Sequence, residues 1–519
     1  MPQSPDDPNP AALTATLIAE VLKARERVYR VGQPTPLESL PLSPHFETWI
    51  KREDLSPINA YKWRGAQNCT TRMVEEAGAR GVVAASAGNH AQGVALSARR
   101  LGVPACIFMP RSTPEMKQKA VRLHGGPDVE VQLVGDTYNE AAEAAHAHAE
   151  RHGMVFIHAF DDLYTIAGQA TIADEMILSG KGPFDLVFVQ IGGGGLAAGV
   201  GTWLKLHYPH ARIIGVEGVD QASMKASLAA GQPVTLPDVD RFCDGTAVTR
   251  PGDLTFALCR DALDGVVTVT NDEVCAAIQT LWELRRVIPE PSGAMGLAGL
   301  VRFAEDHPDE IAGRRVAVIL CGANMDFGKL TLIAGGAAVG AHTRRYFRFR
   351  IGEERGGLLR LLDHVPDVSI AAFLYGKTDE TQAWPVLAFQ GTPQEIDHLH
   401  EQLAAHGLSF EDVTGHADIR YGVIPYVADL FRDPLLLRVH FPERAGALRD
   451  FLRQASDVAS ICYFNYRYTG ETIGRALMGF EFARPDDRAR FEGIIADPGS
   501  VVTCRPVEDE AVGRMLGAG

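Results

Sequence analysis

The stretch LVFVQIGGGGLAAGV, residues 186–200, sets the fold class of this 519-residue chain. A short apolar run ends in a glutamine; one isoleucine and four consecutive glycines follow, and then small and apolar residues. Such a run, when it passes through a turn into a helix, is typical of a buried strand in a parallel sheet. The glycines let the backbone wrap an anion closely, and the helix start adds its positive end.

The same order of strand, turn and helix recurs on both sides of this stretch. The apolar runs predict strands at residues 81–85, 105–109, 154–158, 186–190, 213–216 and 316–320. The helices expected between them include residues 92–100 and 138–151, and this alternation predicts parallel sheets. Ahead of them we expect disorder at residues 1–12, a helix at 13–25 and an extended segment at 33–37.

Composition and charge exclude several classes of protein. The formal net charge of -15 argues against a nucleic-acid partner, because phosphate binding needs a positive surface. The eight cysteines form no C-x-x-C pair, so we expect no metal site or redox motif, and scattered thiols fit a reducing compartment. The amino terminus is unlike a signal peptide, and no apolar run is long enough for a membrane span. These features predict a cytoplasmic protein.

The last third of the chain carries an internal repeat. The stretch ERGGLL at 354–359 resembles ERAGAL at 443–448, which begins 89 residues later. A second set of matches has an offset of 91 residues and joins Ile370, Phe373, Tyr375, Thr378 and Phe389 to Ile461, Phe464, Tyr466, Thr469 and Phe480. The matched order and spacing make coincidence the weaker explanation. Two copies of one supersecondary unit predict paired α+β modules.

Lys62 lies in the segment KREDLSPINAYKWRGA, residues 51–66, between Tyr61 and Trp63. A lysine flanked by aromatic residues is usually a surface lysine whose stem covers the rings. A lysine that forms a Schiff base must instead be partly desolvated, and aromatic neighbours supply such an environment. This segment alone does not decide between the two interpretations.

A second candidate segment stands between the expected strand at 81–85 and the helix that follows it. It consists of Ser86, Ala87, Gly88, Asn89 and His90. Backbone N–H groups at such a place converge on one point, which suits a carboxylate, and the Asn89 amide can donate to a phenolic oxygen. The alternative for Asn89 is an ordinary helix cap. We interpret His90 as a structural histidine in preference to a general base.

Three further candidates lie far along the chain. The glycine loop, Gly192, Gly193, Gly194 and Gly195 with Leu196, suits a phosphate monoester, because it lacks a convincing dinucleotide fingerprint and is not a P-loop. Cys321 follows the strand at 316–320, at the end where open α/β sheets bind ligands, although such a cysteine is more often a small buried apolar residue. Glu290 precedes Pro291, a pattern that also fits a plain helix N-terminus.

In this order the motifs resemble the fold type II pyridoxal-phosphate enzymes, and specifically the biosynthetic threonine ammonia-lyases, or threonine dehydratases. The resemblance runs from about residue 27 to the carboxyl terminus. It implies a tryptophan-synthase-β-like α/β catalytic region of two open parallel-sheet domains, followed by an α+β regulatory region of two ACT-like subdomains. We therefore expect a catalytic domain at 1–330 with a small subdomain at about 67–160, a linker at 331–344, and regulatory subdomains at 345–430 and 431–519.

The resemblance also implies roles for individual residues. Lys62 would carry pyridoxal 5′-phosphate, and Asn89 would bond its 3′-oxygen. The glycine loop would hold the phosphate, Cys321 would face the pyridine nitrogen, and Gly245 of the DGTAV stretch would lie beside the ring. The remaining cofactor contacts would be Tyr61 and Glu290. The substrate carboxylate would be bound by Ser86, Ala87, Gly88, Asn89 and His90.

The implied reaction is deamination of L-threonine to 2-oxobutanoate and ammonia, the first step of isoleucine biosynthesis, in a homotetramer. L-Serine is a second candidate substrate. Isoleucine, and with it valine, would bind the repeated module. The candidate contacts there are Phe464, Asn465, Tyr466, Arg467, Phe373 and Tyr375. The first copy reads FLYG where the second reads FNYR, which puts the polar contacts of the first copy in question.

Some positions depart from the family pattern, and other functions remain open. Ala60 and Tyr61 stand where Ser-Phe is common, and Trp63 replaces an aliphatic residue. Ala87 stands where serine racemases carry a second serine, which favours elimination over racemisation. The alternatives are a catabolic serine/threonine dehydratase, another fold type II elimination or replacement enzyme, and a non-catalytic amino-acid sensor on a lyase scaffold. A nicotinamide dehydrogenase is disfavoured because its fingerprint is missing.

Overall fold

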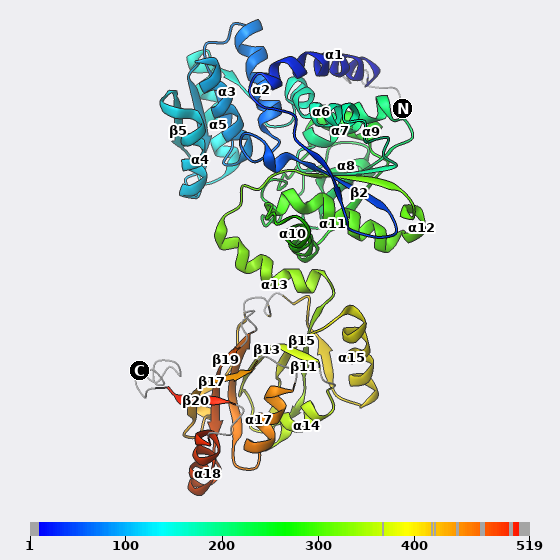
Figure 1. Ribbon diagram of the computed structural model, residues 1–519. Coiled ribbons are helices and arrows are strands. Elements are labelled where there is room, and N and C mark those ends of the chain that lie inside the picture. Colours follow the sequence, from blue (N-terminus) through cyan, green and yellow to red (C-terminus); the bar gives the residue numbers. More distant parts are fainter. Residues whose placement is uncertain are drawn as a thin grey trace. The chain divides into compact units, whose positions relative to one another are not determined.

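The computed structural model describes residues 10–365, 368–416, 419, 422–442, 446–467, 473–497 and 502–507. The chain divides into two compact units, Met1–Ala337 and Ala338–Gly519. Figure 1 shows two helix-covered sheets in the first unit and a single larger sheet in the second. Sheets that are parallel in the first unit and antiparallel in the second agree with the predicted change from α/β to α+β architecture.

The larger sheet of the first unit has the strand order β1-β2-β10-β7-β8-β9, in which only β1 is antiparallel to its neighbour. Along β7, Val187 and Val189 point into one helical layer while Leu186 and Phe188 point into the other. Apolar residues on both faces are required because helices cover both. The strands are β1 (Leu37–Leu40), β2 (Glu47–Arg52), β7 (Leu186–Gln190), β8 (Arg212–Gly218), β9 (Gly265–Val269) and β10 (Arg315–Leu320).

Helices form a layer on each face of this sheet. One layer contains α1 (Pro10–Tyr29), α6 (Leu163–Leu178), α7 (Gly195–His207) and α9 (Asp253–Ala262). The other contains α10 (Asn271–Arg285) and α11 (Pro291–Asp306). The shorter helices are α8 (Ser223–Ala230) and α12 (Pro308–Ile311).

The smaller sheet of the first unit is fully parallel, with the order β5-β4-β3-β6. On β4, Ile107 packs toward α2, α3 and α4, and Phe108 packs toward α5 on the opposite face. Its strands are β3 (Val82–Ala85), β4 (Ala105–Met109), β5 (Val129–Leu133) and β6 (Val155–Phe156). Its helices are α2 (Trp63–Thr71), α3 (Asn89–Leu101), α4 (Glu115–Gly125) and α5 (Tyr138–His152).

The second unit is built on one eight-stranded antiparallel sheet, in the order β16-β11-β15-β13-β18-β19-β17-β20. The first copy of the repeat supplies β11 (Arg344–Phe349), β13 (Ser369–Gly376), β15 (Val386–Gln390) and β16 (Phe410–Asp412). The second supplies β17 (Leu435–Pro442), β18 (Ser460–Arg467), β19 (Ile473–Glu481) and β20 (Thr503–Pro506). A separate two-stranded sheet pairs β12 (Ile351–Gly352) with β14 (Gln382–Ala383).

The two copies are related by a local twofold symmetry within this sheet. Strands β13 and β18 pair antiparallel, so that Phe373 lies opposite Tyr466, and Tyr375 opposite Phe464. The helices of both copies pack on one apolar core. They are α14 (Gly357–Asp363), α15 (Pro393–Ala405), α17 (Ala447–Ala455) and α18 (Pro485–Ala496).

The glycines that precede helices α14 and α17 correct one of the two offsets predicted for the repeat. The N-cap residues of α14 and α17 are Gly356 and Gly446, both with left-handed backbone (φ 71° and 79°). These two glycines are therefore equivalent, at an offset of 90 residues rather than 89. The offset of 91 is found in β13 and β18, where equivalent bulges follow Ile370 and Ile461. Residues 443–445 and Thr469 lie outside the described residues.

Other elements differ from the sequence-based expectations. Strands β1, β2, β5 and β9 were not predicted; they lie at sheet edges or next to them, and their sequences mix polar residues or glycine with the apolar ones. The glycine-rich stretch expected to be a linker forms helix α13 (Leu330–Gly340), since three alanines and two leucines offset its glycines. Within the described residues, no helix is long and apolar enough to cross a membrane.

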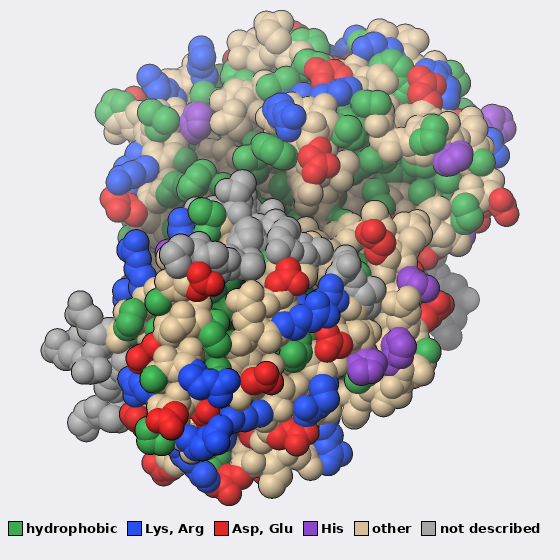
Figure 2. Space-filling model, turned by 60° about the horizontal axis from the view of Figure 1, so that its bottom comes forward, with side chains coloured by type: hydrophobic (Ala, Val, Ile, Leu, Met, Phe, Trp, Pro, Cys, Tyr) green, Lys and Arg blue, Asp and Glu red, His purple; other side chains and the backbone are tan. Residues whose placement is uncertain are grey.

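On the face drawn in Figure 2, basic and acidic side chains are interspersed.

Candidate functional site

Lys62 lies in a tight turn between β2 and α2 that is fastened to the carboxyl end of β10. Within the turn, the Ser56 hydroxyl accepts from the backbone N–H of Ala60 and donates to its carbonyl. The backbone N–H of Tyr61 donates to the Cys321 carbonyl at 2.9 Å, and Ala60 forms an isolated bridge with Gly322. The sequence neighbours of Lys62 are thereby held beside Cys321, 259 positions away along the chain.

The amine of Lys62 is directed toward the DGTAV stretch. Its Nζ donates to the Gly245 carbonyl at 3.3 Å. Burial lowers the pKa of Lys62, although Glu290, Cys321 and Asp244 oppose that shift. A lysine whose pKa is lowered spends more time as the free amine, which is the form that forms Schiff bases and takes protons.

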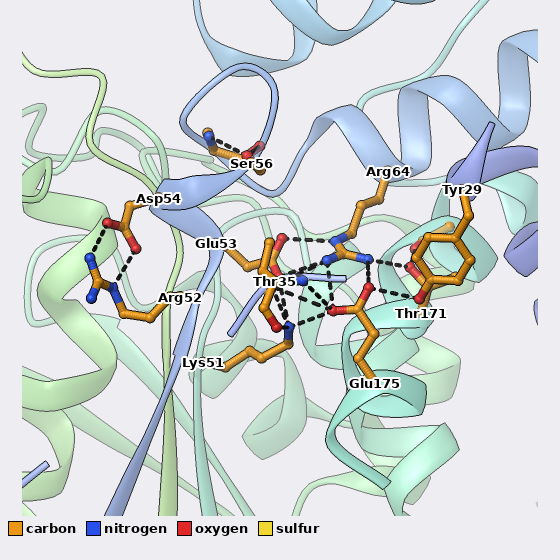
Figure 3. A network of polar contacts seen from close by, with 12 residues as sticks. Tyr29, Thr35, Lys51, Arg52, Glu53, Asp54, Ser56, Arg64, Thr171 and Glu175 are labelled. Atoms are coloured by element: carbon orange, nitrogen blue, oxygen red, sulfur yellow. Dashed lines mark hydrogen bonds and ion pairs between the residues drawn. The ribbon is translucent and has the colours of Figure 1, made fainter. Parts of the chain in front are cut away.

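A buried network of charges surrounds Arg64, two residues after Lys62 (Figure 3). Arg64 donates to both oxygens of Glu53 and of Glu175, at 2.6–3.0 Å. Lys51 donates to Glu175 at 2.5 Å and to the Thr35 carbonyl at 2.6 Å. All four charged side chains are at most 5% exposed, so each is compensated inside the protein rather than by water. The network ties β2, α2 and α6 together around the turn that carries Lys62.

Asn89 opens helix α3 but does not cap it. The N-cap residue is Gly88, and no side chain caps this helix. The Asn89 amide nitrogen instead donates to Glu290 Oε1 at 2.7 Å, and its oxygen accepts from Asn324 at 2.9 Å. This second contact fixes which way the amide faces, because only the nitrogen can then donate toward the Lys62 side. The geometry therefore favours a binding role for Asn89 over the helix-cap alternative.

Glu290 is a buried carboxyl beside these groups. It is 5% exposed, and burial, reinforced by Asp244, raises its pKa to about 7. It precedes Pro291 at the start of α11, as the pattern predicted, but its side chain contacts Asn89 instead of the helix amides. A side chain on Gly322 would collide with Glu290 and Ala60, so only glycine fits there.

His90 is held by the fold. Its Nε2 lies 2.9 Å from the Ile157 carbonyl and must carry the proton, since a carbonyl only accepts. Burial lowers the pKa of His90 to about 3, so the ring is neutral near pH 7. This geometry supports the structural interpretation. Ser86 accepts from the backbone N–H of Gly88 at 3.2 Å, which shapes the loop ahead of α3.

The glycine loop ends at the N-terminus of α7. Gly194, the N-cap residue, has φ 97°, a conformation that favours glycine, and a side chain on Gly193 would collide with the Phe160 ring. The Gly193 carbonyl accepts from Thr255 at 2.6 Å, which secures the loop to α9. The first N–H groups of α7 have no acceptor within their own helix, so the loop presents donors to an anion.

Cys321 closes the site from the end of β10. It is 3% exposed, and burial with the nearby carboxylates of Glu53 and Glu290 raises the pKa of its thiol well above the usual value. The thiol therefore stays protonated and neutral. Burial, together with Cys321 and Glu290, raises the pKa of Tyr61. Among the described residues no cluster of three or more histidine, cysteine, aspartate or glutamate side chains is placed to hold a metal ion.

These residues fit pyridoxal phosphate. The phosphate would face the N–H groups at the start of α7, and a lysine of lowered pKa stands where the aldehyde would attach. The neutral thiol of Cys321 suits an unprotonated pyridine nitrogen, and the oriented Asn89 amide suits a phenolate oxygen. The model of the pyridoxal-phosphate dependent enzymes matches residues 28–322. That of the C-terminal regulatory domain of threonine dehydratase matches residues 432–509.

This chain belongs to the threonine dehydratase family. It is 40% identical over 478 residues to the biosynthetic L-threonine dehydratase of Burkholderia multivorans, covering 91% of this chain and 94% of that protein. A solved threonine deaminase from Solanum lycopersicum is 40% identical, with a TM-score of 0.60, over 65% of this chain and 91% of the other. Maize serine racemase is 30% identical, with a TM-score of 0.56, over 63% and 98%.

Some residues of this threonine dehydratase family member were not recognised in the sequence. Asn324 belongs to the same G-A-N stretch as Cys321, but its contact with Asn89 depends on the folding of distant segments. Arg64 and Glu53 lie in the quoted Lys62 segment, yet their partner Glu175 carries no motif of its own. Nothing local marks a glutamate in a long helix as the partner of an arginine 111 positions earlier.

The second unit contains a pocket between the two copies of the repeat. Tyr375 donates to Glu353 at its polar end, and burial raises the pKa of that carboxyl. The apolar lining includes Leu359, Leu452 and Ile461. Phe373 and Tyr375 of the first copy line this pocket, but Phe464, Asn465, Tyr466 and Arg467 do not.

Proposed function

We propose that this chain deaminates L-threonine to 2-oxobutanoate and ammonia, with L-serine as a second substrate. The observation that carries the proposal is that Lys62, Asn89, the glycine loop and Cys321 meet from four separate segments at the ends of parallel strands. Relatives at about 40% identity are L-threonine dehydratases, which is why we propose threonine as the substrate. These relatives are covered nearly end to end, so the comparison applies to the whole chain.

The residues divide the work of cofactor binding. Lys62 would attach pyridoxal 5′-phosphate, the loop Gly192, Gly193, Gly194, Gly195 and Leu196 would hold its phosphate, and Gly245, Tyr61 and Glu290 would surround the ring. Asn89 would donate to the 3′-oxygen and Cys321 would face the pyridine nitrogen. When bound, the cofactor supplies an electron sink for a carbanion at Cα. A neutral thiol limits that withdrawal, which disfavours transamination.

The substrate would be held by its carboxylate. Ser86, Ala87, Gly88, Asn89 and His90 lead into α3, where backbone N–H groups and the helix start favour an anion. Lys62 would then take the proton from Cα, a role that its lowered pKa supports. Ala87 has no hydroxyl to serve as an acid on the opposite face, which favours elimination over racemisation.

We also propose feedback control by isoleucine, with valine as a second ligand, in the pocket between the repeats. Glu353 would pair with the ammonium group, and the apolar lining would accept a branched aliphatic side chain. The division into a catalytic domain with a small subdomain and two regulatory subdomains fits this arrangement. A homotetramer in the cytoplasm completes the proposal, as the family implies.

Steady-state turnover tests these proposals together. We expect 2-oxobutanoate from threonine, slower turnover of serine, and no β-replacement on O-acetylserine. Isoleucine should shift the threonine saturation curve to higher concentrations, and effector and substrate must influence each other equally at equilibrium. A protein that binds pyridoxal phosphate but turns over neither hydroxy amino acid would instead be a sensor on a lyase scaffold. Unchanged saturation with isoleucine would contradict the feedback proposal alone.

A further inference from the structure

A salt bridge joins the two sheets of the first unit beside Lys62. Lys117, in the first turn of α4, donates to Asp244 Oδ2 at 2.5 Å. Helix α4 packs on the smaller sheet through Val121. Asp244 belongs to the larger sheet's side, because its segment is tied to the residues after β8: Gln221 donates to the Cys243 carbonyl and accepts from Thr246. The pair therefore spans the two halves of the catalytic unit.

Asp244 is also close to the reacting amine. The next residue, Gly245, supplies the carbonyl that accepts from Lys62 Nζ. Burial alone would raise the pKa of Asp244, but Lys117, Lys329 and Lys62 outweigh it and hold the pKa below its usual value. Because Asp244 and Gly245 are consecutive, a displacement of Asp244 would also move the carbonyl that accepts from Lys62 Nζ.

A second lysine, Lys329, also lies near the Asp244 carboxylate, so Asp244 does not depend on Lys117 alone for a neighbouring positive charge. Lys329 Nζ lies 3.8 Å from Asp244 Oδ1 and donates to the Phe242 carbonyl at 2.9 Å, on the same side as Asp244. If Lys117 moves away, Asp244 keeps a cationic neighbour, so breaking the pair leaves no isolated charge. Lys117 and Asp244 are also 25% and 35% exposed, which makes the contact reversible.

The catalytic groups lie on both sides of this contact. The Ser86–Asn89 loop belongs to the smaller sheet, whereas the glycine loop, Gly245 and Cys321 belong to the larger one. A substrate held between them needs both halves in register, and apparent affinity falls with the fraction of molecules in that state. We propose that Lys117 and Asp244 are positioning residues that latch the smaller sheet against the larger one around the bound amino acid. This inference rests on the proposed function for the substrate site.

The test is a double-mutant cycle with Lys117→Gln, Asp244→Asn and the double variant, with rates normalised to bound cofactor. Each single change should raise KM for threonine about fivefold, the effect of losing one partly exposed ion pair, while kcat changes less than about twofold. The double variant should be no worse than the single variants, because the partners act as one unit. Additive effects, or a KM equal to that of the unmodified protein, would overturn the latch.

Lys205→Gln is the matched control. Lys205 pairs with Asp264 at 2.7 Å, and the exposed fractions of the two side chains, 26% and 32%, are close to those of the latch pair. Lys205 is on α7 and Asp264 stands just before β9. Both residues belong to the larger sheet's side, so this pair does not connect the two sheets. We expect the control to leave KM unchanged. An equal rise of KM in the control would mean that the effect comes from lost surface charge.

Hydrogen exchange gives a readout that does not depend on turnover. With L-2-aminobutyrate, which lacks the β-hydroxyl leaving group, amides of α4 should be protected in the unmodified protein and less protected in Lys117→Gln. Equal protection in both proteins would overturn the latch even if KM changes. If threonine is not turned over at all, the proposed function fails, while exchange in the ligand-free proteins still shows whether the pair restrains α4.

Discussion

The two units of this protein use short sequence motifs in opposite ways. In the first unit, motif residues such as Lys62, Asn89 and Cys321 lie where strands end and helices begin, and hydrogen bonds join them to distant segments. In the second unit, the repeated Phe-x-Tyr motif lies within strands β13 and β18. Phe373 and Phe464 are fully buried with ring centroids 4.2 Å apart, so this motif builds the sheet.

The difference teaches where a conspicuous residue pattern becomes a binding site. At strand ends the backbone no longer hydrogen-bonds to a neighbouring strand, so its N–H groups and the side chains there can bind a ligand. Within paired strands the backbone is already bonded and alternate side chains are buried, so the same kind of pattern specifies pairing. Tyr375 is intermediate, since it is buried at 6% exposure yet lines the pocket through its hydroxyl end.

The largest expected effect is at Lys62. Lys62→Ala should reduce threonine deamination by roughly 10³-fold or more, because cofactor attachment and the base at Cα are both lost. The melting temperature of the cofactor-free protein should change little, since Lys62 makes one polar contact at 3.3 Å. Assays of 2-oxobutanoate formation with Lys119→Ala as control would check this. A variant that keeps the unmodified rate would remove Lys62 from the site.

The buried charges around Arg64 should come next. Arg64→Met should destabilise the first unit by about 3–5 kcal/mol, because it leaves the buried carboxylates of Glu53 and Glu175 with one neighbouring cation, Lys51, in place of two. Arg30→Met is the matched control, since Arg30 pairs with Glu75 at 46% and 43% exposure and should cost less than about 1 kcal/mol. Urea unfolding of the first unit measures the loss of stability in both variants. An equal loss in Arg64→Met and Arg30→Met would contradict the comparison.

Truncation of Phe464, in the Phe-x-Tyr motif of β18, should lower the free energy of unfolding of the second unit by a similar amount. Phe464→Ala should cost about 3–5 kcal/mol through the cavity that it leaves against Phe373. Calorimetry that separates the transitions of the two units would show the loss in the second. Turnover at saturating threonine without isoleucine should be kept. If catalysis fell instead while the second unit stayed stable, the motif would be a functional contact and not a structural one.

The smallest expected effect is at the polar end of the pocket. Tyr375→Phe removes the donor to Glu353, a hydrogen bond to a charged group, and should raise the isoleucine concentration for half-inhibition by about three- to tenfold. Basal kcat should not change. Tyr463→Phe, on the neighbouring strand and outside the pocket lining, is the control. An unchanged isoleucine response in Tyr375→Phe would place the effector elsewhere.

Much of the fold could be predicted because its signals are local. The runs at 105–109 and 186–190 coincide with β4 and β7, since strands buried on both faces are continuously apolar. The edge strands β5 and β9 escaped that criterion because their apolar residues are mixed with polar residues or glycine. The candidate residues of the site were chosen from loops next to such runs, and the structure brings Lys62, Gly245, Glu290, Asn89 and Cys321 together.

The sequence by itself determined the chemistry that is available: a lysine between aromatic residues, an asparagine at a helix start, four glycines and a strand-end cysteine. Only the tertiary structure decided their partners. Asn324 orients Asn89, Glu175 compensates Arg64, and Lys117 reaches Asp244 across two sheets. The physical reason is that periodicity and turn residues report burial and backbone conformation along the chain. Which distant group compensates a charge or fixes an amide depends on how the sheets and helices pack.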